Sequence, residues 1–212
     1  MYLIRNSQGQ ASLADAQGRH FDPASRSWGK AQGLPTEAHP VSAEQALCWL
    51  QRESGHPLRP PIGVIGPREA SDQHRQTAGQ VGRLLARCGF VVICGGRQGV
   101  MEAVCEGVAA EGGVSIGLLP DEHWDAANPH VTIPIATGIG VARNAIIARA
   151  AGCLIAIGGG YGTHSEMAFG LQFERPVIGL LDAPDIPGTI RPAGPEALAE
   201  ALLRTLTGKP DQ

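Results

Sequence analysis

The chain has 212 residues, of which 43% are hydrophobic, and its formal net charge is -3 at pH 7. This length accommodates one sizeable domain with a smaller appendage. The small negative charge gives no reason to expect nucleic acid or an anionic membrane as a partner. No apolar run is long enough to span a bilayer, and residues 1–5 do not open a signal peptide, so we expect a cytoplasmic protein.

The cysteines form no C-x-x-C pair, and three of them lie inside apolar segments. This usage favours reduced core residues over a disulfide framework. We also expect no metal site. The five cysteines are Cys48, Cys88, Cys94, Cys105 and Cys153.

Residues 1–60 differ in pattern from the rest of the chain and predict a small element of short strands and one helix. Ser42 precedes a helical pattern over 43–50 and is a suitable N-cap. The proline-rich segment 55–61 is typical of a linker. We therefore divide the chain into an N-terminal element, 1–60, and a main domain, 61–212. Short strands are expected at 2–5, 19–22 and 27–28, with a turn at 7–10.

From Ile62 onward, apolar strands alternate with helical patterns. This alternation indicates a parallel sheet covered by helices on both faces, with right-handed crossovers. We therefore predict an α/β fold, a doubly wound Rossmann-like domain whose ligand binds at the carboxyl ends of the strands. Strands are expected at 62–66, 90–94, 114–119, 131–135, 153–157 and 176–181, and helices at 71–88, 100–111, 138–151, after a cap at Thr163, and at 195–206.

A glycine-rich turn follows the apolar strand 153–157. Thr163 stands where the next helix would be capped, and Glu166 follows at the spacing of a capping box. Glycines let the backbone approach a ligand closely, and the first N–H groups of the helix point at it. We therefore expect a phosphate at this helix N-terminus. The glycines of the turn are Gly158, Gly159, Gly160 and Gly162.

Three nearby features have alternative interpretations. The turn Gly95–Gly99 is either a second ligand contact or a plain tight connection; it lacks the dinucleotide fingerprint, and the chain has no P-loop motif. Glu166 is either only the capping partner of Thr163 or a catalytic carboxylate one turn from the phosphate. Arg143 begins its helix against the helix dipole, which favours either a nearby anion or an ordinary solvated side chain.

Together these residues resemble the Lonely Guy (LOG) family of the SLOG superfamily, whose members were long labelled possible lysine decarboxylases. The family hallmark P-G-G-x-G-T-x-x-E is matched from Gly158 to Glu166, with Gly158 in place of the proline. The family arginine lies fifteen residues before that proline, and Arg143 keeps this gap. The segment G-G-R-Q-G-V-M from Gly95 is a third match. The resemblance covers about residues 62–181.

The resemblance implies a homo-oligomer, a dimer or tetramer, that binds a small phosphorylated ligand. LOG enzymes cleave the N-glycosidic bond of nucleoside 5′-monophosphates and release a free base and ribose 5-phosphate. By this resemblance Arg143 and Glu166 are the catalytic pair: the carboxylate stabilises oxocarbenium character on the ribose, and the arginine orients the ligand. The residues implied to hold the phosphate and nucleotide are Gly95, Gly96, Gly99, Gly159, Gly160, Gly162 and Thr163.

The chain departs from the LOG pattern next to Arg143. LOG enzymes carry M-H-x-R-K, whereas this chain keeps only the arginine and has Asn144 at the lysine position. The segments R-N-x-x-I and I-G-G-G-Y-G-T are closer to the branch related to molybdenum cofactor carrier proteins, which hold the cofactor's phosphate without chemistry. Two interpretations therefore stay open: a phosphoribohydrolase that requires no cofactor, or a carrier of molybdenum cofactor or another phosphorylated ligand.

Overall fold

The computed structural model describes residues 1–5, 11–35 and 37–208, which form two compact units. The first unit combines residues Met1–Pro57 with the segment from Leu198 onward, and the second is Leu58–Ala197. The turn expected at 7–10 lies outside the described residues. None of the helices described is both long and apolar enough to cross a membrane. All five cysteines are free.

The second unit is built on a six-stranded sheet in which every neighbouring pair is parallel. The strand order is β11-β10-β6-β7-β8-β9. Strands β6, β10 and β11 are buried along their whole length, as continuous apolar runs in a doubly covered sheet require. The predicted Rossmann-like α/β fold is confirmed. The strands are β6 (Ile62–Ile65), β7 (Val92–Cys94), β8 (Ser115–Leu119), β9 (Ile133–Ala136), β10 (Cys153–Ile157) and β11 (Val177–Leu180).

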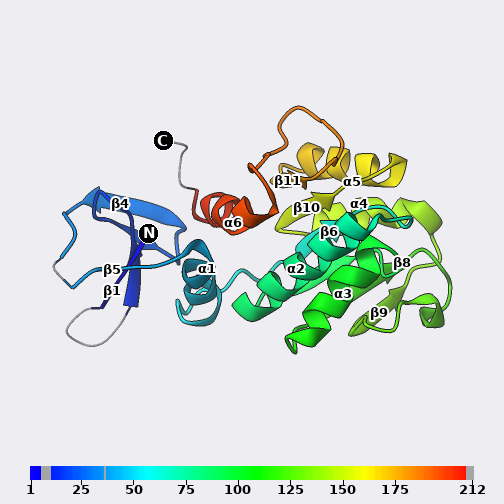
Figure 1. Ribbon diagram of the computed structural model, residues 1–212, viewed down its shortest axis with the longest axis horizontal. Helices are drawn as coiled ribbons and strands as arrows, with labels where there is room; N and C mark the ends of the chain where they lie inside the picture. The colour runs from blue at the N-terminus through cyan, green and yellow to red at the C-terminus, as the bar shows by residue number, and fades with distance from the viewer. Residues whose placement is uncertain (6–10, 36, 209–212) are drawn as a thin grey trace. The chain divides into compact units, whose positions relative to one another are not determined.

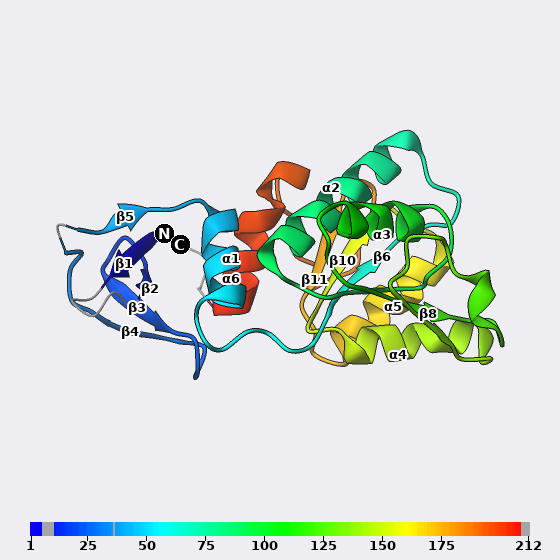
Figure 2. The same cartoon turned by 90° about the horizontal axis from the view of Figure 1, so that it is seen from below.

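Helices cover both faces of this sheet (Figures 1 and 2). Two of them, α2 (Asp72–Cys88) and α3 (Val100–Ala110), lie on one face, and α4 (Arg143–Ala150) and α5 (Tyr161–Gln172) lie on the other. Strand β6 is flanked by β7 and β10, so the connections that leave β6 and β10 pass to opposite faces. Ile65 pairs with Ala156, which brings the carboxyl ends of β6 and β10 level. This is the switch point at which doubly wound folds bind ligands.

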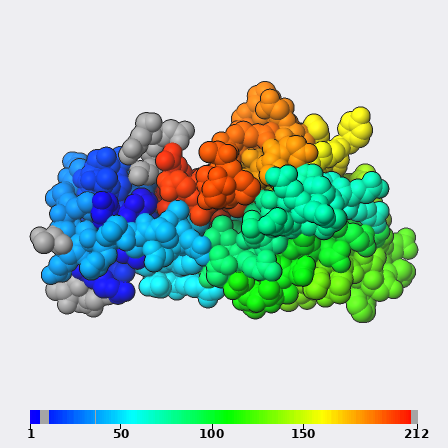
Figure 3. All heavy atoms as spheres, viewed as in Figure 1, coloured from blue at the N-terminus to red at the C-terminus, as the bar shows by residue number. Residues whose placement is uncertain are grey.

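The contact between α2 and α3 depends on glycine. The two helices lie side by side in the space-filling view (Figure 3). A Cβ on Gly107 would lie 2.2 Å from the carbonyl oxygen of Gly79, and a Cβ on Gly82 would lie 2.3 Å from the carbonyl oxygen of Val104. Both distances are shorter than any van der Waals contact, so the helix backbones touch directly at these positions.

We predict that Gly107→Ala destabilises the protein by about 1–3 kcal/mol, because the methyl group forces the helices apart. Gly79→Ala is the matched control, since its Cβ would meet only an arginine side-chain tip at 3.4 Å and a carbonyl oxygen at 3.7 Å. That variant should be neutral or more stable by up to about 1 kcal/mol, from helix propensity. Urea unfolding of the two variants measures the difference. Equal stabilities would contradict direct backbone contact at Gly107.

The first unit is a five-stranded antiparallel sheet with two helices. The strand order is β4-β3-β2-β1-β5, and the sequence analysis missed β2 and β5. Ser42 caps α1 as expected, in a capping box with Gln45. The elements are β1 (Tyr2–Arg5), β2 (Ala11–Ala14), β3 (Arg19–Asp22), β4 (Ser27–Ala31), β5 (His39–Pro40), α1 (Ala43–Arg52) and α6 (Leu198–Thr207).

The last helix, α6, belongs to this first unit, which corrects its expected place in the domain 61–212. It packs on α1, and the indole N–H of Trp28 donates to the carbonyl oxygen of Thr207 at 3.0 Å. Leu202 and Leu203 are buried. The physical reason is that α6 is amphipathic and adds its buried leucines to the apolar core formed by the short strands and α1.

Candidate functional site

A pocket of about 450 Å³ lies at the switch point of the sheet. Its walls come from five segments that follow different strands: the β6–α2 loop, the turn after β7 with the start of α3, Pro120 after β8, and the starts of α4 and α5. The site residues that line it are Gly95, Arg143, Gly160, Gly162, Thr163 and Glu166. Gly96, Gly99 and Gly159 lie in the adjoining turns and do not line it.

Helix α5 begins at Tyr161 with Gly160 as its N-cap, three residues before the cap expected at Thr163. Gly160 has no side chain, and Thr163 lies inside the first turn. The predicted capping box of Thr163 and Glu166 is therefore wrong. The first helical bond runs from the His164 N–H to the Gly160 carbonyl oxygen at 3.0 Å. The N–H groups before it are donors that a helix cannot satisfy internally, and no side chain caps them.

Space is open beside two of the glycines at this helix start. A Cβ on Gly160 would meet no atom within 4 Å, and one on Gly162 would meet only the Asn144 amide nitrogen at 3.9 Å. Gly159 differs, since a Cβ there would lie 2.5 Å from the side chain of Thr163. Gly160 and Gly162 thus leave room for a ligand beside the helix N-terminus, whereas Gly159 makes room for Thr163.

Close steric contacts also explain why glycine stands at three positions in the turn after β7. A Cβ on Gly95 would lie 2.3 Å from the Arg143 Nη2, so this glycine admits the guanidinium. A Cβ on Gly99 would lie 2.2 Å from the Arg68 carbonyl oxygen, where the β6–α2 loop crosses the start of α3. Gly96 packs against Gly117 and has φ of 69°. The turn is a tight connection that positions Arg143, and a ligand contact there stays a prediction.

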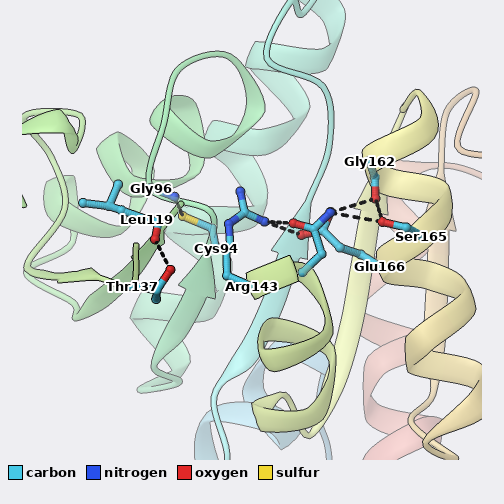
Figure 4. Close-up of polar contacts among 9 residues, drawn as sticks. Cys94, Gly96, Leu119, Thr137, Arg143, Gly162, Ser165 and Glu166 are labelled. Atoms are coloured by element: carbon cyan, nitrogen blue, oxygen red, sulfur yellow. Dashed lines mark hydrogen bonds and ion pairs between the residues drawn. The ribbon is translucent and has the colours of Figure 1, made fainter. Parts of the chain in front are cut away.

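Arg143 and Glu166 meet inside the pocket (Figure 4). The Arg143 Nη1 donates to the Glu166 Oε1 at 3.2 Å, and both side chains are about nine-tenths buried. The same nitrogen donates to the Oδ1 of Asn144. The arginine comes from the start of α4 and the carboxylate from the second turn of α5. The predicted pair is therefore brought together, and Arg143 is not an ordinary solvated side chain.

Asn144, at the family lysine position, connects this pair to the glycine-rich turn. Its Nδ2 donates to the Ser165 Oγ at 3.1 Å, and the Ser165 hydroxyl donates to the Gly162 carbonyl oxygen at 2.7 Å. An amide provides both an acceptor for Arg143 and a donor for α5, whereas a lysine provides only donors. The sequence marked this position only as a departure from a motif, and its bonding needed the structure.

Burial raises the pKa of the Glu166 carboxyl from 4.5 to about 7. The Arg143 guanidinium lowers the pKa by its charge and its hydrogen bond, but the loss of hydration outweighs both effects. Near neutral pH this carboxyl exchanges between its acid and carboxylate forms. A carboxyl with that behaviour can donate or accept a proton at physiological pH.

The raised pKa of Glu166 predicts stability that falls as the pH rises. Between about pH 4.5 and about pH 7 the native protein keeps a proton that the unfolded chain releases. Relative to Glu166→Gln, wild-type protein should lose roughly 3 kcal/mol of unfolding free energy across this interval. Urea unfolding of both proteins at a series of pH values measures the loss. A difference that stays constant with pH would contradict the raised pKa.

Arg97 is a pocket residue that the sequence analysis did not single out. It follows Gly96, lines the pocket and pairs with the carboxylate of Asp121 in the loop after β8. The Asn128 amide donates to the Arg97 carbonyl oxygen at 3.0 Å. In the sequence, the position of Arg97 between the glycines of the turn was the signal that could have indicated a pocket residue. The partners of Arg97 lie more than twenty residues away in sequence and could not be inferred from spacing.

A doubly wound parallel sheet with a glycine-rich, uncapped helix start at its switch point defines a Rossmann-like α/β protein. The chain belongs to the SLOG cluster4 family, whose model matches residues 59–199. The expected membership of the SLOG superfamily is confirmed.

Two relatives of this chain are named for molybdenum cofactor, and a third is uncharacterized. It is 35% identical to the molybdenum cofactor binding protein of Rippkaea orientalis, with a TM-score of 0.64 over 68% of this chain and 96% of that one. It is 31% identical to the molybdenum cofactor carrier protein of Chlamydomonas reinhardtii, with a TM-score of 0.64 over 72% and 100%. An uncharacterized protein of Archaeoglobus fulgidus is 44% identical over 119 residues, 56% of this chain and 78% of the relative.

Proposed function

We propose that the protein binds the phosphate of a small ligand at the N-terminus of α5 and acts as a carrier of molybdenum cofactor or a related phosphorylated compound. The observation that carries this proposal is the uncapped helix start, with open space at Gly160, beside the buried guanidinium of Arg143. Free N–H groups, the helix dipole and a cation all favour an anion at one place. The similarity to two proteins named for this cofactor supports the choice of ligand.

The residues present fit a ligand of this kind. Molybdenum cofactor combines a terminal phosphate with a pterin, and a pocket of about 450 Å³ falls within the range of small-molecule sites. Gly160, Gly162 and Thr163 would hold the phosphate. The cofactor supplies the redox-active metal, whereas the chain supplies binding, orientation and exclusion of water. Met101 and Val141 add apolar lining that suits a ring system.

Nucleotide phosphoribohydrolase activity is the second candidate, and the contact between Arg143 and Glu166 favours it. In its ionised form the Glu166 carboxylate would stabilise positive charge on the ribose and orient a water molecule for attack on the anomeric carbon. Arg143, which stays protonated, would hold the ligand and the carboxylate in place. We rank this candidate second because the chain keeps only the arginine of the family segment M-H-x-R-K and has Asn144 at the lysine position.

The proposed homo-oligomer has support from exposed apolar side chains near the pocket. Val141 is 84% exposed and Tyr161 is 95% exposed, and both precede or open helices that line the site. An apolar patch formed by such side chains would be typical of a contact surface. The remaining large apolar side chains exposed in the second unit are Val114, Trp124, Ile133, Ile135, Ile139, Ile146, Phe169 and Ile190.

Replacement of Gly160 tests the anion site. Its φ of -118° suits any residue, and a Cβ there meets no atom within 4 Å. Gly160→Asp places a carboxylate where it caps the first-turn N–H groups itself and repels a second anion. We expect the fold to be kept, and sulfate affinity measured by calorimetry to fall at least about tenfold, a change of about 1.4 kcal/mol.

Gly160→Asn is the control, because it has the same shape without the charge. The aspartate variant should bind sulfate more weakly than the asparagine variant. If wild type and Gly160→Asp bind sulfate equally, the anion does not bind at the start of α5.

A direct binding assay separates the two candidate functions. Molybdenum cofactor released from a molybdoenzyme is mixed with the protein, unbound cofactor is removed by gel filtration, and retained pterin is measured by fluorescence after oxidation. We expect retention by wild type and loss in Gly160→Asp. In parallel, AMP, CMP and a cytokinin monophosphate are assayed for release of ribose 5-phosphate.

The carrier predicts no release of ribose 5-phosphate from any of these nucleotides. Release that disappears in Glu166→Gln and in Arg143→Ala, with no retention of pterin, would establish the hydrolase and reject the carrier. The paired variants guard against a contaminating nucleotidase, whose activity would not follow either substitution.

A further inference from the structure

His74 lies directly beneath the glycine-rich turn and is held at both ring nitrogens. The Ser71 N–H donates to its Nδ1 at 3.3 Å, so the ring proton sits on Nε2, which donates to the Asp182 Oδ1 at 2.6 Å. Ser71 and His74 belong to the N-terminus of α2, where they form a capping box. Asp182 follows strand β11. The side chain of His74 is 14% exposed, and that of Asp182 is 72% exposed.

The imidazole ring occupies the space that a side chain at position 158 would fill. A Cβ on Gly158 would lie 2.5 Å from the His74 Nε2 and 2.8 Å from its Cε1. Gly158 also has φ of 60°, which proline cannot adopt. The absence of the motif's proline therefore has a structural explanation: at this position the chain has a glycine in a left-handed conformation and a histidine ring packed against it.

The segment that contains Asp182 also contacts Gly158 directly. The Gly158 N–H donates to the carbonyl oxygen of Leu180, the last residue of β11, at 3.3 Å. One short segment, 180–182, thus contacts the turn twice: directly through Leu180 and indirectly through Asp182 and His74. Consecutive glycines have more conformational freedom than other residues, and a ligand that binds them must order them unless the protein has done so already.

We propose that His74, held by Asp182, is a positioning residue that orders the turn Gly158–Gly160 and so sets the direction of the first N–H groups of α5. The inference rests on the proposed anion site and adds residues from α2 and from the end of β11 to it. Neither His74 nor Asp182 lines the pocket. Both act through the backbone of the turn.

Asp182→Ala separates this role from simple electrostatics, because the two explanations predict opposite changes in sulfate affinity. Removal of a negative charge near an anion site strengthens anion binding if charge alone matters. Loss of the hydrogen bond to His74 frees the turn and weakens binding. We expect sulfate affinity to fall about five- to tenfold in Asp182→Ala, from the weight of one charge-assisted hydrogen bond. Asp182→Asn, which keeps an acceptor for the Nε2 proton, should bind sulfate as wild type does or more tightly.

Two further variants serve as matched controls. Asp185→Ala removes a fully exposed carboxylate three residues away and should leave sulfate affinity unchanged or slightly higher. His74→Gln keeps the helix cap, since Ser42 and Gln45 form the same capping box in α1, but it loses the ring and its contact with Asp182. It should therefore fold normally and bind sulfate as weakly as Asp182→Ala does. Sulfate is the probe because its charge is constant across neutral pH.

The outcomes decide the two proposals separately. If wild type binds sulfate and Asp182→Ala binds it at least as tightly as Asp185→Ala does, the positioning role is rejected while the anion site stands. If wild type binds no sulfate, the anion site fails, and amide hydrogen exchange of residues 158–163 tests the ordering of the turn on its own. Faster exchange there in Asp182→Ala than in Asp185→Ala supports the role of His74, and equal exchange overturns it.

Discussion

The site depends on one topological constraint: the chain leaves the neighbouring strands β6 and β10 toward opposite faces of the sheet. These strands end level, and their connections pass to opposite faces of the sheet, so a crevice opens between the segments that follow them. Every pocket wall is a segment that leaves a strand at this edge. Because segments that follow five different strands converge there, residues distant in sequence act on one small space.

The two buried ionisable groups that line this crevice, Arg143 and Glu166, lie against each other. The buried Arg143 faces a carboxyl whose pKa lies near 7, and the neighbouring Asn144 is neutral where the LOG pattern has a lysine. A buried cation without a partner is costly, and removal of one member of such a pair leaves the other uncompensated. The arrangement suits an anionic ligand, since proton uptake by Glu166 leaves Arg143 free to face the incoming charge.

The sheet and most helices were predictable from sequence because continuous apolar runs and glycine turns recur at regular spacing. The convergence of Arg143, Glu166 and the glycines of α5 was predictable as well, through the motif that contains them. The start of α5 was not, because Thr163 and Glu166 imitate a capping box although the helix begins at Tyr161. His74 and Arg97 escaped notice because their partners, Asp182 and Asp121, lie far along the chain. Hydrogen bonds between residues far apart in the chain leave no periodic pattern in the sequence.

The return of α6 to the N-terminal unit has a consequence for the order of events during synthesis. Residues 1–57 emerge from the ribosome first, yet the apolar faces of α1 and the small sheet gain their cover only when α6 has been made. The sheet unit, 58–197, is complete in itself before that moment. Although domains usually fold in the order in which they emerge, here the later unit has all its elements before the earlier unit has its last helix.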